Sequence, residues 1–254
     1  IGTVTHPPTS ALSATSGTFT TDLTVDTSTL KVDSTNNRVG VGTGSPSRTF
    51  QVDSADNRVA KVHHTDGDYS FIVFEDDNTS DDGQVRVGAY GNDLQLFAGG
   101  SARILADSTG AVTMPAQPAF LAIPSSAQLN LPLNATTTIV FGTEVFDQNS
   151  DFASNTFTAP VTGKYQLNAS VYLQSVDGST GFYQLYITTS NRNHLAIFSG
   201  NELAADPAYK NLSLSILTDM DAGDTAIVQM QLHTGGNAQA DVSNQARFSG
   251  YLVA

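Results

Sequence analysis

The densest group of residues that could bind an ion runs from Asp76 to Gly83, where four aspartates and one asparagine stand close together. Counted from Asn78, oxygen-bearing side chains fall at alternate positions and Gly83 is the sixth residue, as in a calcium-binding loop. The twelfth position, where such a loop needs a bidentate glutamate, is Ala89. We therefore expect a solvated hairpin loop, with a weak calcium site as the alternative and no other cofactor.

Other motifs that could carry chemistry have simpler structural interpretations. Gly40–Gly44 is glycine-rich like a phosphate-binding loop, but Pro46 follows in place of the helix that such a loop needs, so we expect a turn. His63 and His64 are adjacent in a predicted strand, so their rings should point to opposite faces and cannot bind one metal within a chain. A threefold assembly could still gather copies of one of them. The chain has no cysteine and no Gly-x-Ser-x-Gly sequence, so we expect neither an enzyme nor a catalytic or metal-binding residue.

Polar loops and one outward tyrosine offer a different chemistry, which is recognition by hydrogen bonding and ring stacking. A tight turn at 191–194 combines donors, a cation and a ring, and a long glycine-rich loop spans 233–241. Loops of this kind carry binding because a rigid framework can hold them. Tyrosine on an outward strand face, together with planar polar groups, suits sugar binding. The candidate ligand-binding residues are Asn191, Arg192, Asn193, His194, His233, Asn237 and Tyr186.

Charge and composition restrict the partners and the fold class. The 254 residues include 11 Lys and Arg against 24 Asp and Glu, a net charge of −13, which argues against nucleic acid as a partner. No apolar run reaches the ~18 residues that span a membrane, so we expect no membrane insertion. Glutamate occurs only at positions 75, 144 and 202, while turn-forming Asp, Asn, Ser, Thr and Gly abound, which predicts an all-β protein. Because the chain opens at Ile1 without a Met-led signal peptide, we expect a fragment or a processed form.

The elements that must position these residues fall into three parts. Residues 1–22 are rich in Thr, Ser and Pro and predict an extended linker or shaft segment. Residues 23–116 contain short strands and an internal repeat, in which 30–39 and 50–59 share a strand, an Asp/Ser/Asn turn and a second strand. Such hairpins cannot bury an apolar face alone, so we expect a shaft that packs on its neighbours or on other chains. A proline-containing stretch at 114–118 marks the boundary, and 117–254 form the last domain.

The last domain has longer strands with regular alternation, as in 165–173 and 226–232, which predicts a β-sandwich. It resembles the globular head of complement subunit q, a jelly-roll relative of tumour necrosis factor. The resemblance rests on Thr156–Tyr165, which contains a Phe-x-x-Pro-x-x-Gly-x-Tyr stretch, on Ala222-Gly223-Asp224, and on the ending Phe248–Leu252. One departure is Asp151-Phe152, where the family often has Tyr-Asp. The resemblance implies a ten-stranded jelly roll that forms a homotrimer, and the final strand should be central in its sheet.

The N-terminal half carries a motif that resembles a different group of proteins. Asn37–Ser47 resembles a repeat of bacteriophage tail fibres, with Gly44 where a second threonine is usual. Together the two resemblances imply a virion fibre whose jelly-roll head attaches to a host surface glycan or protein receptor and whose shaft contacts other tail or capsid proteins. The alternatives are a structural decoration fibre whose head only trimerises and caps the shaft, and a secreted lectin-like module. A depolymerase is disfavoured, because the chain lacks the length and the repeated rungs of a parallel β-helix.

Overall fold

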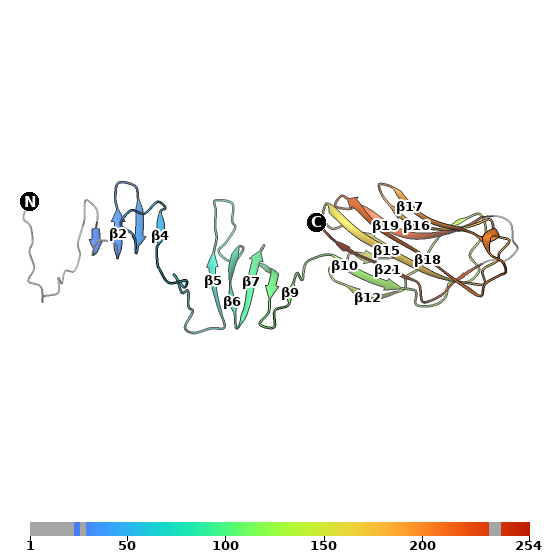
Figure 1. The fold of residues 1–254 in the computed structure, drawn as a ribbon, viewed down its shortest axis with the longest axis horizontal. Helices are drawn as coiled ribbons and strands as arrows, with labels where there is room; N and C mark the ends of the chain where they lie inside the picture. The colour runs from blue at the N-terminus through green and yellow to red at the C-terminus, as the bar shows by residue number, and fades with distance from the viewer. Residues whose placement is uncertain (1–22, 26–28, 234–239) are drawn as a thin grey trace, which may run out of the picture. The chain divides into compact units, whose positions relative to one another are not determined.

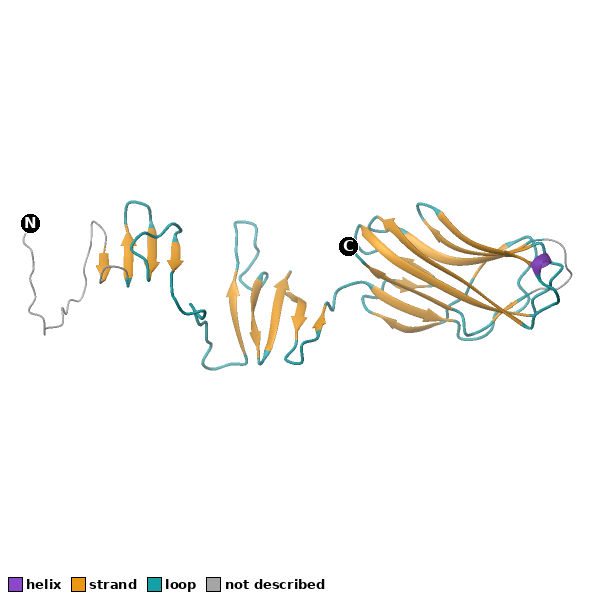
Figure 2. Cartoon of the chain, viewed as in Figure 1, coloured by secondary structure: helices purple, strands orange, loops and turns teal. Residues whose placement is uncertain are grey.

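The computed structural model describes residues 23–25, 29–233 and 240–254, and these fall into two compact units that divide between Ser70 and Phe71. Within the described residues the fold is all-β, as predicted, and its one helical element is the 3₁₀ turn η1 (Gly200–Glu202) (Figure 2). The predicted linker 1–22 and the 234–239 part of the glycine-rich loop, with Asn237, lie outside the described residues. The boundary between 116 and 117 stays a prediction.

The first unit contains a four-stranded sheet in chain order, formed by β1 (Leu23–Val25), β2 (Leu30–Asp33), β3 (Arg38–Val41) and β4 (Phe50–Val52). The first copy of the repeat forms the predicted hairpin β2–β3, whose turn is held by the Asp33 carboxylate accepting backbone N–H bonds from the two residues at 35 and 36. Gly42 has a φ of +75°, and a Cβ there would collide with the carbonyl oxygen of Asp53. The glycine-rich segment is therefore a turn, as predicted.

The second copy of the repeat does not form a hairpin. Its first strand, β4, pairs in parallel with β3, and residues 53–68 continue without strand structure. The prediction of a second hairpin was wrong: β4 is the edge strand of its sheet, and the residues after it do not return to pair with it. Within it, the Asp56 carboxylate accepts the backbone N–H of Arg58, which stabilises a local turn instead. His63 and His64 also lie outside any strand, and the His64 ring stands 6.2 Å from the ring of Tyr69.

A second sheet contains five strands in chain order (Figure 1). One of its faces encloses an arginine, since the Arg86 guanidinium lies 4.8 Å from the ring centroid of Phe71 and 4.1 Å from that of Phe97. Such stacking is favourable when the cation is desolvated. The strands are β5 (Tyr69–Val73), β6 (Arg86–Tyr90), β7 (Asp93–Ala98), β8 (Ser101–Ala106) and β9 (Val112–Thr113).

The C-terminal residues form two packed six-stranded sheets, more strands than the ten expected because several are very short. Sheet one has the order β12-β10-β21-β15-β18, with β20 also paired to β15; sheet two has the order β13-β14-β19-β16-β17, with β11 also paired to β19. Figure 1 shows the long strands of the two sheets running alongside one another. The strands of sheet one are β10 (Ala119–Ile123), β12 (Thr143–Asp147), β15 (Gly163–Gln174), β18 (Tyr209–Met220), β20 (Asp241–Val242) and β21 (Arg247–Leu252). Those of sheet two are β11 (Thr136–Thr138), β13 (Phe152–Ala153), β14 (Thr156–Thr158), β16 (Phe182–Thr189), β17 (Asn193–Ser199) and β19 (Thr225–Leu232).

The core between these sheets follows from strand alternation. In β15 every second residue from Tyr165 to Leu173 is buried, while the residues between them face outward. The final strand β21 lies between β10 and β15, which confirms that it is central. Gly250 permits this packing, because a Cβ there would stand 2.5 Å from Leu167 Cδ2 and 2.8 Å from the Phe120 ring.

Candidate binding surface of the jelly roll

The outward face of sheet two carries the strongest group of recognition side chains. Along β16, Tyr183, Leu185 and Ile187 are buried in the core, so Gln184 and Tyr186 point away from it. The same alternation operates on the neighbouring strand β19, whose polar residues at 229 and 231 stand directly opposite positions 186 and 184. The two strands therefore form one outward polar surface.

Hydrogen bonds connect the side chains of this surface. The Tyr186 hydroxyl donates to Gln184 Oε1 at 3.0 Å and lies 3.5 Å from Gln231 Oε1. Thr188 Oγ1 donates to Gln229 Oε1 at 3.0 Å. These bonds hold planar amide groups in fixed orientations beside a phenol ring. We refer to this surface as the amide platform, made of Gln184, Tyr186, Thr188, Gln229, Gln231 and His233.

His233 completes the amide platform at the end of β19. Its Nε2 lies 2.8 Å from Gln184 Oε1, and its ring meets the Phe182 ring edge-on at 6.4 Å. Two of the predicted binding residues, Tyr186 and His233, are thus brought together through Gln184. Sequence reasoning missed the three glutamines, although alternation already placed Gln229 and Gln231 on an outward face.

Two exposed aliphatic side chains border the platform on β17. Leu195 stands opposite Tyr186 and Ile197 opposite Gln184, and the two are 45% and 47% exposed. No outward residue of β16, β17 and β19 carries a formal charge. The surface therefore combines neutral hydrogen-bonding groups, a ring and apolar contact area.

The turn at 190–192 lies at the opposite end of β16 from His233, so the two predicted loops do not form one site. Its side chains are engaged within the chain. Asn191 Nδ2 donates to Asp224 Oδ2 at 2.8 Å, and Arg192 forms an ion pair with Asp219 at 2.8 Å. These contacts fasten the turn to the β18–β19 connection.

His194 differs from the expected exposed ring. It pairs with Ile187 and shares that residue's inward side of the sheet, and its Nε2 is buried without a hydrogen-bond partner among the described residues. Burial, followed by the nearby Arg192 cation, lowers the pKa of His194, while Asp219 opposes the change. Asn193 is exposed beside it on the outward face.

The outward face of sheet one carries a separate polar ladder. Ser215 Oγ donates to Asn168 Oδ1 at 2.7 Å, and Ser170 Oγ donates to Asn211 Oδ1 at 3.0 Å. Asn168, Ser170 and Ser215 line a shallow hollow of about 330 Å³ that also includes Arg247 and Ser249. Here the serine hydroxyls and the asparagine amides largely satisfy one another.

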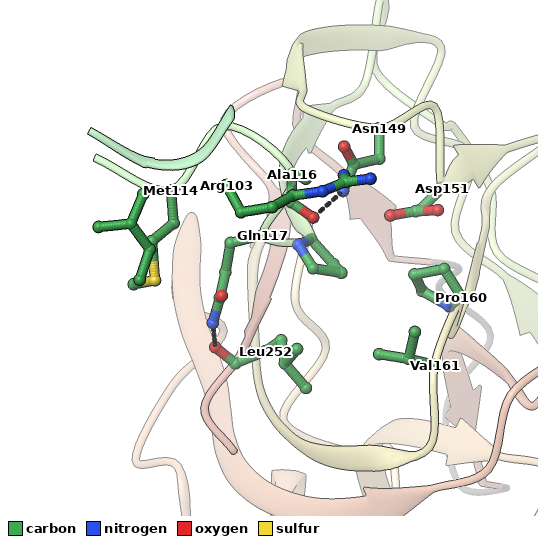
Figure 3. A pocket seen from close by; sticks show the side chains of 11 residues that line it. Arg103, Met114, Ala116, Gln117, Asn149, Asp151, Pro160, Val161 and Leu252 are labelled. Carbon is green, nitrogen blue, oxygen red and sulfur yellow. Dashed lines mark hydrogen bonds between the residues drawn. The ribbon is translucent and has the colours of Figure 1, made fainter. Parts of the chain in front are cut away.

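A larger hollow of about 600 Å³ lies where the connector 114–118 meets the jelly roll (Figure 3). The connector is held by side-chain amides: Gln148 donates to the carbonyls of Met114 and Gln117, and Asn149 donates to that of Ala116. Gln117 in turn donates to the Leu252 carbonyl. Side-chain hydrogen bonds therefore hold the connector to the jelly roll.

Asp151 lines this hollow, and Figure 3 shows it beside Asn149 and Pro160. Its Oδ2 is buried and has no hydrogen-bond partner among the described residues. Burial raises the pKa of Asp151, and the Asp147 carboxylate adds to the effect, while a hydrogen bond from Asn149 opposes it. The arrangement is a partly desolvated carboxylate beside a second carboxylate.

The acidic segment at 76–83 forms turns with its own oxygens. Asp76 accepts the backbone N–H of Asn78 and the Thr79 hydroxyl, and Asp81 accepts from Gly83 N and Gln84 Nε2. These bonds lower the pKa of both carboxyl groups, the Asn78 N–H acting most on Asp76 and the Gln84 amide most on Asp81. Among the described residues, no three His, Asp or Glu side chains are grouped to hold a metal.

The C1q domain model matches residues 119–253, which is more than half of the chain. The chain belongs to the C1q domain family. Among solved structures, the globular domain of zebrafish complement 1qA is similar, with 18% identity, 54% of this chain and 98% of that chain covered, and a TM-score of 0.40. Murine APRIL is also similar, with 14% identity, 54% and 99% coverage, and a TM-score of 0.40. No curated protein matches the chain.

C1q and tumour-necrosis-factor-like domains typically form homotrimers, bind receptors, occur outside the cell and are generally not enzymes. The predicted family landmarks have clear structural roles in this C1q domain. The Tyr165 hydroxyl donates to the Val161 carbonyl across the Pro160–Gly163 turn, and Phe157 is fully buried. Within the described part of the chain, no helix has the length and apolar character to cross a membrane.

Proposed function

We propose that this chain is a homotrimeric attachment fibre whose C1q domain binds a receptor on a host cell surface. The observation that carries the proposal is the amide platform on a C1q domain, a domain class that typically binds receptors. The segment at 37–47, similar to tail-fibre repeats, favours a virion as its location, with a secreted module as the alternative. Tail or capsid proteins would then contact the N-terminal part.

The chemistry of the platform favours a neutral ligand. Tyr186 offers a ring for stacking on a sugar face, and Gln229 and Gln231 offer amides with both donors and acceptors for hydroxyl groups. The absence of formal charge on the outward residues of β16, β17 and β19 gives an anionic ligand no partner, and the chain's net charge of −13 repels one. A neutral glycan, or an uncharged polar protein surface, fits best.

The test is adsorption of the full chain to host cells, measured with fluorescent protein and by competition with the particle. Tyr186→Ala and Gln231→Ala should weaken binding, because a central contact residue commonly costs about 2 kcal/mol or more on truncation. The matched control is Ser213→Ala on the outward face of sheet one, which should bind normally. Normal binding by both platform variants, with unchanged Tm, would contradict the proposed site.

A structural cap is the second candidate function, and one observation favours it. Asn191 and Arg192, which the sequence suggested as binding residues, are bound to Asp224 and Asp219 within the same domain. If the full chain forms trimers but neither binds cells nor competes with the particle, the domain serves only to assemble and close the fibre. Light scattering at micromolar concentration measures the assembly state. A stable monomer would contradict both the attachment function and the structural-cap function.

A further inference from the structure

The five-stranded sheet β5–β9 has two chemically different faces. On one face Phe71, Arg86 and Phe97 pack together, with the two rings 5.2 Å apart and the guanidinium against both. Arg86 thereby covers the aromatic rings of its own sheet. The two rings are covered in this way, whereas Tyr69, Val73 and Tyr90, which alternation places on the same face, are 55%, 42% and 49% exposed.

The opposite face follows from alternation and register. Ile72 and Val87 adjoin Phe71 and Arg86 in sequence, so they point the other way. Val87 pairs with Leu96, which pairs with Ile104. In the next row, position 94 pairs with 106, which pairs with 112. The result is a continuous patch that crosses all five strands, which we call the aliphatic face: Ile72, Val87, Leu94, Leu96, Ile104 and Val112.

The aliphatic face is open to solvent in the single chain. Exposed fractions are 50% for Ile72, 49% for Leu94, 38% for Leu96 and 64% for Val112. No described strand outside the sheet makes more than a marginal contact with it. A one-layer sheet with an uncovered apolar face is not a stable arrangement, because a sheet needs a second layer over its apolar side. An apolar patch of this kind marks an interaction surface.

We propose that the aliphatic face packs against the same face of the other copies of this chain, so that three sheets close a common core. This inference rests on the proposed homotrimer and extends it beyond the C1q domain. Two features favour a second copy as the occupant. The six named side chains are uncharged, although Arg103 adjoins Ile104 in β8, so copies of a chain with net charge −13 can approach through these side chains without added repulsion. The second feature is the short connection to the C1q domain, because β9 ends at Thr113 and β10 begins at Ala119.

The short connection between β9 and β10 couples the five-stranded sheet to the C1q domain. The connector at 114–118 is fixed to that domain by the hydrogen bonds of Gln148, Asn149 and Gln117. Assembly of three C1q domains therefore gathers three connectors. The preceding sheets are then held at high effective concentration, so that even a modest apolar contact associates. A lipid surface or an apolar ligand would not benefit from this tethering.

The chain has no cysteine, so a single introduced thiol reports contacts between copies without background. We would compare Leu96→Cys with Gln95→Cys in the full chain, since Gln95 is the next residue of β7 and points to the other face. A short bismaleimide should join two chains through Leu96→Cys and leave Gln95→Cys as single chains. A monofunctional maleimide checks that both thiols react, and Leu94→Cys replaces Leu96→Cys if the latter misfolds.

Light scattering of the same samples separates this inference from the proposed function. A trimer that cross-links through Leu96→Cys alone supports the aliphatic face as the contact. A trimer that cross-links equally at both positions, or at neither, overturns this inference and leaves the homotrimer standing. A monomer overturns both. As a second measurement, Leu96→Asp should lower Tm by roughly 5–10 °C relative to Gln95→Asp, and equal Tm values would contradict burial of the face.

Discussion

Asp151 shows how a single carboxylate can be held in an unfavourable position. Its Oδ2 is buried without a described partner, and the Asp147 carboxylate nearby accepts backbone N–H bonds from Asp151 and Phe152. Asp147 therefore organises the 147–152 turn, while Asp151 carries the electrostatic cost of being near it. We therefore expect the two carboxylates to have opposite effects on stability, although they are close in sequence.

Asp151→Asn should raise Tm at neutral pH. Because its pKa is raised in the folded state, Asp151 contributes stability below its ordinary pKa, and this is lost as pH rises through the folded pKa. Removing the charge should raise Tm by roughly 2–4 °C near pH 7, and the gap should close near pH 4 or below. Scanning fluorimetry at both pH values measures this. Asp147→Asn is the control and should lower Tm; a lower Tm for Asp151→Asn would show that its carboxylate has a favourable partner.

His194 should make the C1q domain less stable in mild acid. Its pKa is lowered in the folded state, so the neutral ring contributes stability above the ordinary histidine pKa, and this is lost as pH falls. Lowering pH from about 7.5 to about 5 should reduce Tm more in the native chain than in His194→Gln. His233→Gln is the control variant, because the His233 ring lies on the outward face. An identical pH response of the native chain and His194→Gln would rule out this role.

At the scale of elements, alternation predicted most of the C1q domain. The long strands at 165–173 and 226–232 bury the residues that their period of two assigns to the core. The buried Phe248 lies on β21, which is central in its sheet as the sequence predicted. The pattern could not show that Asn191 is bound to Asp224, because that contact joins two turns far apart in sequence. It also could not show the missing second hairpin at 53–59, since a repeat specifies local turns but not which strands go on to pair.

The connector should behave as part of the C1q domain. A fragment that starts at residue 112 keeps the three connector carbonyls that Gln148 and Asn149 bind, whereas one that starts at 119 leaves these amides without partners. Each lost hydrogen bond costs about 1 kcal/mol, so the shorter fragment should melt roughly 5 °C or more below the longer one. Calorimetry of the two fragments measures the difference. Gln148→Ala in the longer fragment should reproduce part of it, and equal Tm values for both fragments would show that the connector is not part of the folded domain.

On the scale of the whole molecule, the two parts of the chain differ in how they become stable. The C1q domain buries Phe120, Phe157 and Tyr165 between two sheets of a single chain. The sheets at 23–52 and 69–113 are single layers, and Val112 and Phe50 are mostly exposed. A single layer gains little from apolar burial, so we expect its folding to be coupled to that of other copies.

We therefore expect residues 112–254 to fold alone and residues 1–116 to fail to do so. The first fragment should melt in one cooperative transition with the near-ultraviolet signal of packed aromatic rings, because its core is complete. The second should show no cooperative transition at micromolar concentration, because its aliphatic face has nothing to register it against other copies. Fusing residues 1–116 to an unrelated trimerisation domain supplies that register and should restore a cooperative transition, while fusion to a monomeric domain should not. If residues 1–116 alone form trimers and melt cooperatively, the N-terminal part assembles by itself and the C1q domain is not what brings the chains together.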